Sequence, residues 1–171
     1  FEDTVPPLVR HMAAQRDDKG NGCDVLVNLT NDAWFHGSSE LDEHLIIAAF
    51  RCVETRTPMV RCVNGGISAF IDGNGTIREP AAIHVAKEPF DGLQVELNPV
   101  EGLRDPETGY WRRQFSGIIS AQVPLDPRAS LYVRFGDWFA QLCLLTTLVF
   151  VGLSWLRSRI PTSETAVQRA V

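Results

Sequence analysis

The sequence predicts an α/β domain followed by one transmembrane helix, and two observations support this. The chain between Val25 and Ile71 begins with a short apolar run, which is typical of a strand. A segment of helical periodicity and then two alternating segments follow, which are typical of a helix and two further strands. From Trp138 to Leu156 the chain carries no charged residue. At about 1.5 Å rise per residue, that segment is long enough to span a hydrocarbon core of about 30 Å.

Composition permits one folded domain and disfavours a nucleic-acid partner. The chain has 171 residues, of which 44% are hydrophobic and 22% charged, ordinary values for a protein with a buried core. The formal net charge is −5, whereas nucleic-acid binders usually present a clustered basic face.

The first elements follow from local patterns. Pro6 to Arg16 is predicted to be a short helix with proline at its start. Asp17 to Gly22 is predicted to be a polar turn, and Val25 to Leu29 has the apolar run of a buried strand. Thr30 to Ser38 is expected to be a loop.

A longer helix is predicted from Ser39, which can cap it, to about Thr55. Leu41, Leu45 and Val53 are among its apolar residues at helical spacing. One side of this helix is therefore expected to face the core.

Further strands are predicted after this helix. Met59 to Val63 and Ile67 to Ile71 alternate in strand fashion, and the sequence from Asp72 to Gly75 suits a hairpin turn. From 78 to 113 proline, glycine and charge replace any pattern, so we expect an irregular surface insertion without chemistry. Ile118 to Val123 returns to strand alternation.

Flanking residues support the membrane assignment. Trp138 and Trp155 lie near the two ends of the apolar segment, where their rings favour the membrane interface. Arg157 and Arg159 follow it, so the positive-inside rule predicts a cytoplasmic C-terminus and a body on the opposite side. A buried helix of a soluble core is the alternative.

The predicted organisation therefore has three parts. Residues 1–134 form a catalytic-type domain that includes the insertion at 78–113. Residues 135–157 form the transmembrane helix, and residues 158–171 form a cytoplasmic tail.

The four cysteines give no sign of a metal site. Cys23, Cys52, Cys62 and Cys143 form no C-x-x-C pair, and no histidine lies at zinc-ligand spacing from them. Free buried thiols are favoured, although a disulfide between Cys52 and Cys62 stays open. We expect neither a metal nor an organic cofactor.

The blocks VNLTNDAWF, RCVETRTPMVR and NGGISAFID, in this order and spacing, resemble the apolipoprotein N-acyltransferase family. This is the membrane branch of the carbon–nitrogen hydrolase (nitrilase) superfamily. The following residues carry the match: Asn28, Asn31, Asp32, Trp34, Phe35, His44, Arg51, Glu54, Arg56, Pro58, Arg61, Asn64, Gly66, Ser68 and Asp72.

The resemblance implies a fold, an activity and a location. The fold is the C-terminal half of a nitrilase-type α-β-β-α sandwich with one transmembrane helix after it. The implied activity moves a fatty acyl group from a phospholipid, through a cysteine thioester, to the N-terminal amine of a lipidated apolipoprotein. The implied parent is a monomeric, multi-pass protein of the bacterial inner membrane, with its catalytic domain in the periplasm.

The family's Glu-Lys-Cys triad is not found in this chain. Phe1 and Glu2 match the last two positions of the family's cysteine–aromatic–glutamate motif, so the resemblance puts the nucleophile immediately before Phe1. Glu2 is then a supporting catalytic residue, and Phe1 lines the substrate pocket. The chain alone is expected to be inactive.

The loop after the first strand provides further candidates. Asn31, Asp32, Trp34 and Phe35 either wall the substrate pocket near the thioester or only stabilise the loop through Asx turns and a tucked aromatic. Both interpretations remain open.

Other polar residues are read as structural. His44 is expected to be a satisfied helical histidine. Glu54 with Arg51 or Arg56, and Arg61 on the next strand, are expected to form a partly buried ion-pair set. Cys62 is disfavoured as a substitute nucleophile because no base adjoins it.

Two other functions remain open. The parent could be a membrane-anchored amidase of the nitrilase superfamily that hydrolyses its thioester with water. The chain could also be a non-catalytic, membrane-tethered module.

Overall fold

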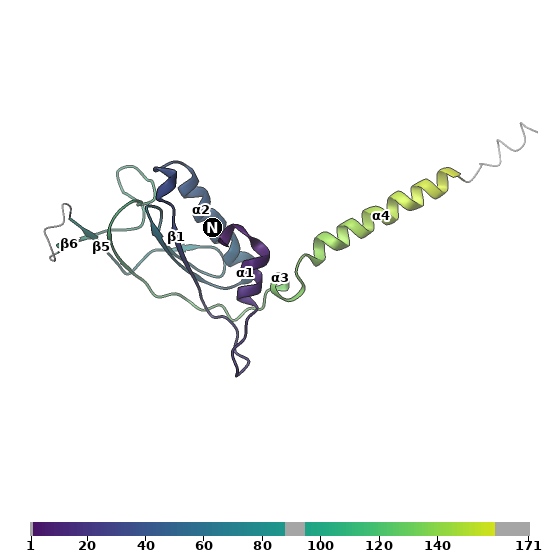
Figure 1. Cartoon of the computed structure of the whole chain (residues 1–171), viewed down its shortest axis with the longest axis horizontal. Coiled ribbons are helices and arrows are strands. Elements are labelled where there is room, and N and C mark those ends of the chain that lie inside the picture. The colour runs from purple at the N-terminus through teal and green to yellow at the C-terminus, as the bar shows by residue number, and fades with distance from the viewer. Residues whose placement is uncertain (1, 88–94, 160–171) are drawn as a thin grey trace, which may run out of the picture. The chain divides into compact units, whose positions relative to one another are not determined.

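The structure, a computed structural model, describes residues 2–87 and 95–159 (Figure 1). Its helices are η1 (Glu2–Thr4), α1 (Pro6–Ala13), η2 (Ala33–Phe35), α2 (Glu40–Thr55), α3 (Leu131–Phe135) and α4 (Trp138–Arg159). Its strands are β1 (Leu26–Asn31), β2 (Met59–Asn64), β3 (Ala69–Ile71), β4 (Ile77–Arg78), β5 (Ala82–Ala86), β6 (Leu97–Val100) and β7 (Gly117–Ser120). The chain divides into two units, residues 1–136 and 137–171.

The first unit is the predicted α/β domain, and its main sheet has the order β1-β2-β3-β4. β1 and β2 are parallel, joined through α2, with Leu26 opposite Met59 and Asn31 opposite Asn64. β3 and β4 complete the sheet as antiparallel strands. Because β1 and β2 run the same way, the loops that follow them, after Asn31 and Asn64, meet at one edge of the sheet.

The helices cover one face of this sheet. Leu41 and Leu45 of α2 are at most 1% exposed and pack into one core with Met59 and Ile71. Burying a leucine side chain contributes about 1.5–3 kcal/mol, so these two leucines help to hold α2 to the sheet. Val53, which the sequence assigned to the same apolar side, is instead 37% exposed.

The opposite face of β1 is largely uncovered among the described residues. Val27 is 66% and Leu29 74% exposed, while Leu26 between α2 and the sheet is buried. Successive side chains of a strand point to opposite faces, so β1 has one packed face and one open apolar face. β1 is also an edge strand of its sheet.

The hairpin turn predicted from Asp72 to Gly75 is confirmed. Oδ1 of Asp72 accepts hydrogen bonds from the backbone N–H groups of Asn74 and Thr76. Gly75 has φ +78°, a conformation that residues with a Cβ adopt at a cost.

The segment 78–113 differs from the irregular insertion that we expected. It contributes β5 and β6, which form a second sheet of order β6-β5-β7. Ile83 and Leu103 are 2% and 1% exposed, so this segment has buried anchors of its own. The sequence did not predict β6 because it carries Pro99 and is mostly exposed, so it lacks the usual alternation of apolar and polar residues.

Two helix ends also differ from expectation. α1 ends at Ala13 rather than Arg16, because Arg16 pairs with Gly22 across the 17–21 turn. Ser39 precedes α2 but makes no side-chain cap bond, since its backbone is already helical at φ −62° and ψ −19°. Acidic residues in the first turn, Asp42 among them, still complement the helix dipole.

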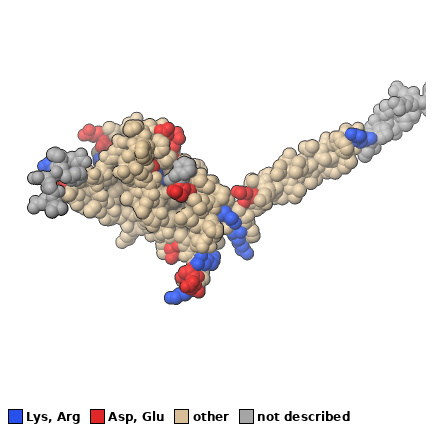
Figure 2. Space-filling view, in the orientation of Figure 1, with Lys and Arg blue, Asp and Glu red and all other residues tan. Residues whose placement is uncertain are grey.

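The second unit contains α4, which is long and apolar enough to cross a membrane. Its mean hydropathy is 1.9, and Figure 2 shows an uninterrupted apolar or neutral surface along it, with basic side chains at its carboxyl end. Those basic residues are Arg157 and Arg159. The predicted apolar helix is thus present as a candidate membrane span; it extends to Arg159, two residues into the predicted tail, and residues 160–171 lie outside the described residues.

Candidate functional site

The amino-terminal turn η1 contains the acidic residue that the sequence singled out and a second one that it did not. Glu2 is exposed, whereas Asp3 is 3% exposed. Oδ2 of Asp3 accepts a hydrogen bond of 2.8 Å from Nη1 of Arg61. Phe1 lies outside the described residues.

Arg61 is the centre of a buried ionic network. It projects from β2 with a fully buried side chain, and its Nη1 also donates to Oδ1 of Asn28 at 2.8 Å. Its Nη2 donates to Oδ2 of Asp32 at 2.8 Å. One guanidinium therefore ties η1, β1 and the loop after β1 to β2.

Asp32 joins this network to α2. Its Oδ1 accepts from the Thr30 hydroxyl at 3.1 Å and lies 3.3 Å from Nδ1 of His44. Asp32 is 1% exposed, and its backbone N–H donates to the carbonyl of Asn64 at 2.9 Å. Each carboxylate oxygen of Asp32 thus has its own donor, as a buried charge requires.

Close packing of two loops at this sheet edge depends on glycine. Gly65 has φ +73°, and a Cβ there would come within 2.6 Å of the Ala33 Cα. A Cβ on Gly66 would meet Asp32 at 3.0 Å. The Asn-Gly-Gly sequence after β2 therefore lets the two loops lie against each other.

The other loop candidates divide into structural and accessible side chains. Oδ1 of Asn31 accepts from the Ala33 N–H and from Nδ2 of Asn64, which is an Asx-type turn with a cross-strand link. The Phe35 ring packs against the core and meets the His44 ring edge-on at 4.8 Å.

Trp34 differs from its neighbours because it is 76% exposed. The structure therefore brings Asp32, Phe35 and His44 together inside the protein. It leaves Trp34 and Asn31 exposed, Asn31 at the end of β1 and Trp34 in the turn that follows.

The predicted ion-pair set is corrected by these contacts. Arg51 does pair with Glu54, at 3.0 Å. Arg56 instead donates to backbone and amide oxygens of the 72–75 turn, and Arg61 belongs to the separate network described above. Asp3 was missed because its partner lies 58 residues further along the chain, a distance that no local pattern reveals.

The cysteines agree with the expectation of free thiols but not of general burial. All four are free; Cys52 is buried, while Cys62 and Cys143 are exposed. Burial, reinforced by the nearby charge of Asp72, raises the pKa of Cys52 to about 12. Burial also raises the pKa of the Cys23 thiol. Since the thiolate is the nucleophilic form, neither is poised to attack an ester at neutral pH.

Within residues 2–87 and 95–159, no group of three or more His, Cys, Asp or Glu side chains is arranged to hold a metal ion.

Curated proteins give this arrangement a family context. The chain is 31% identical over 160 residues to the apolipoprotein N-acyltransferase of Geobacter metallireducens, a match that covers 94% of this chain and 24% of that protein. The chain belongs to the apolipoprotein N-acyltransferase family. No family model matches the sequence.

Two further family members support the assignment. The enzyme of Bdellovibrio bacteriovorus is 34% identical over 93% of this chain, and that of Rhodopirellula baltica is 35% identical over 78%. These matches cover 23% and 18% of the two relatives. The chain thus spans about a quarter or less of the length of these N-acyltransferases.

Proposed function

We propose that the protein containing this chain transfers a fatty acyl group from a phospholipid to the N-terminal amine of a lipidated apolipoprotein. The chain supplies part of the catalytic domain and a membrane anchor. The nucleophilic cysteine and the triad's Glu and Lys belong to the parent outside this chain, so the chain by itself is inactive.

The observation that carries this proposal is the contact of Asp3 with Arg61. A 2.8 Å bond between fully buried groups fixes η1 against the end of the sheet where the Asn31–Phe35 loop lies. A cysteine one residue before Phe1 would be held at the same edge. The network therefore supports a site in which nucleophile, Glu2 and the loop after β1 adjoin one another.

The reaction has two acyl transfers. The cysteine thiolate attacks the ester carbonyl of the phospholipid, the C–S bond forms, the ester C–O bond breaks, and the lysophospholipid alcohol takes up a proton. The apolipoprotein amine then attacks the thioester, the C–N bond forms, and the thiolate leaves. A base that accepts the amine proton completes the balance.

Residues of this chain have supporting roles in that scheme. Glu2 is exposed next to the expected nucleophile, where its carboxylate can orient the lysine or the incoming amine. Trp34, 76% exposed, and Asn31 offer side chains to the substrate, and Phe1 is proposed as a further pocket residue from the motif alone. Asp32 and Phe35 shape the loop from beneath.

Membrane attachment and sidedness complete the proposal. α4 holds the domain at a bilayer that contains the acyl donor, and Arg157 and Arg159 favour a cytoplasmic C-terminus. The catalytic domain then faces the periplasm of a bacterial inner membrane.

The test uses the full-length protein in a strain depleted of its own N-acyltransferase. Mass spectrometry of lipoprotein N-termini is expected to show triacylated ends, and diacylated ends when the cysteine before Phe1 is changed to alanine. The cysteine variant at equal membrane abundance is the control. Persistently diacylated N-termini with the unaltered protein would overturn the proposal, and released free fatty acid would then indicate the hydrolase.

A further inference from the structure

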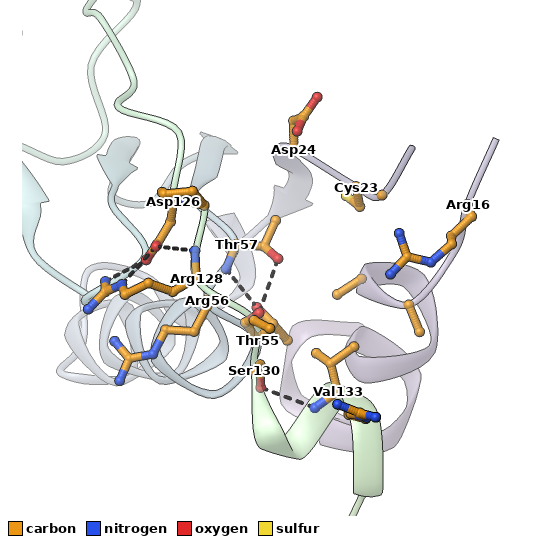
Figure 3. Close-up of a pocket in the computed structure, with 16 residues that line it drawn as sticks. Arg16, Cys23, Asp24, Thr55, Arg56, Thr57, Asp126, Arg128, Ser130 and Val133 are labelled. Carbon is orange, nitrogen blue, oxygen red and sulfur yellow. Dashed lines mark hydrogen bonds and ion pairs between the residues drawn. The ribbon is translucent and has the colours of Figure 1, made fainter. Parts of the chain in front are cut away.

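A second feature of the domain is a cleft of about 660 Å³ at the other end of the main sheet (Figure 3). Its walls include residues 22–24, just before β1, and residues 55–57, just before β2. Residues 126–130 and 133–134 close it. The Asn31–Phe35 loop follows the carboxyl end of β1, so the cleft and that loop lie about 20 Å apart along the strand.

The cleft is rich in positive charge. Four arginines, Arg16, Arg56, Arg128 and Arg134, line it against two aspartates, Asp24 and Asp126.

Arg128 and Asp126 neutralise each other. Nε of Arg128 donates to Oδ1 of Asp126 at 2.8 Å, and this interaction holds the pKa of Asp126 at about 2. Three arginines therefore remain against one aspartate.

These three arginines contact neutral groups among the described residues. Nη1 of Arg16 donates to the Gly20 carbonyl, and Nη1 of Arg56 donates to the Gly73 carbonyl and the Asn74 amide oxygen. The Arg134 guanidinium lies 5.0 Å from the Phe135 ring centre. Their charges are held in place but not cancelled, which is the condition for binding an anion.

Figure 3 shows Arg16 on the opposite side of the cleft from Arg56 and Arg128. Guanidinium donors therefore line both walls of the cleft. Guanidinium groups match phosphate geometry, because two parallel N–H groups can bond two oxygens of the same phosphate.

One residue of the cleft lies close in sequence to α4. Arg134 precedes Trp138, the first residue of α4, by four positions. Four residues of fully extended chain reach at most about 14 Å. The backbone of Arg134 therefore lies within that distance of the first residue of the proposed membrane span, and phospholipid headgroups lie at the ends of such a span.

We propose that this cleft binds a phosphate-bearing anion, with the headgroup of an anionic phospholipid as its source. None of the residues expected to bind the acyl-transfer substrates lines it. The bound lipid would hold the domain at the bilayer surface, and binding needs no turnover. The inference therefore stands or fails separately from acyl transfer.

The test compares two charge-matched double variants of the full-length protein in neutral detergent micelles. The first is Arg16→Gln with Arg134→Gln; the control, Lys87→Gln with Arg104→Gln, removes the same charge outside the cleft. Isothermal titration calorimetry is run with dihexanoyl-phosphatidylglycerol, dihexanoyl-phosphatidylcholine and inorganic phosphate. Losing two arginines is expected to weaken phosphatidylglycerol binding about 30-fold, and the control is expected to leave it unchanged.

Asp24→Asn provides an independent check, because removing the unpaired acid should tighten binding about fivefold. Stronger binding of phosphatidylglycerol than of inorganic phosphate supports a lipid source, and equal binding supports the phosphate site but overturns the lipid source. Equal loss in both double variants, or equal affinity for phosphatidylglycerol and phosphatidylcholine, overturns the proposal.

Discussion

Two arginine–aspartate clusters lie at opposite ends of the main sheet, with bonds of similar length but in different surroundings. At the carboxyl ends of β1 and β2, Arg61 bonds Asp32 at 2.8 Å with both side chains at most 1% exposed. At the amino ends, Arg128 bonds Asp126, and 52% of the Arg128 side chain is exposed. Burial, rather than distance, decides how much each cluster contributes to stability.

The largest effect is expected from Arg61→Met. Removing the guanidinium takes away the cation that bonds the buried Asp3 and Asp32, and breaking such a buried pair costs about 3–5 kcal/mol. Chemical denaturation of the full-length protein in micelles measures the free energy of unfolding. A loss below about 1 kcal/mol would show that the Arg61 network contributes little to the stability of the carboxyl end of the main sheet.

Gly65→Ala tests the loop contact beside that network. A left-handed conformation costs a residue with a Cβ about 1–2 kcal/mol, and here the Cβ would also strike Ala33. Gly109→Ala is the matched control, because Gly109 has φ +72° with nothing within 4 Å of its Cβ position. The unfolding free energy should fall further for Gly65→Ala than for Gly109→Ala. Equal losses would show that the Cβ at position 65 does not clash with Ala33.

A smaller effect is expected from Arg128→Gln at the opposite end. Water screens the Arg128 side chain, which is 52% exposed, although Asp126 is only 7% exposed. This substitution should therefore change the unfolding free energy far less than Arg61→Met does. The same denaturation experiment measures it. A loss comparable with that of Arg61→Met would contradict the contrast between the two clusters.

The smallest effect is a pH dependence confined to residues 126–128. The hydrogen bonds from Arg128 lower the pKa of Asp126 from 3.8 to about 2. A depressed carboxyl pKa stabilises the folded state above pH 3.8, and this contribution is lost as pH falls toward 2. Hydrogen exchange at residues 126–128 should accelerate over that interval, and Asp126→Asn should remove the change. An unchanged pH profile in Asp126→Asn would assign the effect to another group.

Local periodicity predicted most of the main sheet. The strand at β1, the helix ending at Thr55 and the turn at Asp72–Gly75 all follow from patterns within a few residues. The predicted burial of β1 holds for one face only, since Val27 and Leu29 are exposed. β5 and β6 could not be predicted in this way, because strands as short and exposed as β6 carry little apolar alternation.

The candidate site was predictable only in part, for a different reason. Family resemblance found Glu2, Asp32 and Trp34, but their environments depend on contacts between distant segments. The buried partner of Arg61 at the amino terminus was Asp3, next to the residue that the motif had singled out. The motif drew attention to Glu2, and the three-dimensional contacts show that the buried acid of this turn is its neighbour Asp3.

The most direct test of the central claim is lipoprotein acylation by Asp3→Asn in the full-length protein. If Asp3 positions the amino-terminal turn through Arg61, the fraction of triacylated lipoprotein N-termini and the thioester that accumulates without acceptor should both fall at equal membrane abundance. Asp105→Asn, which changes a half-exposed acid in the 105–110 turn outside this network, should leave both unchanged. Unaltered thioester and acylation in Asp3→Asn would contradict the account.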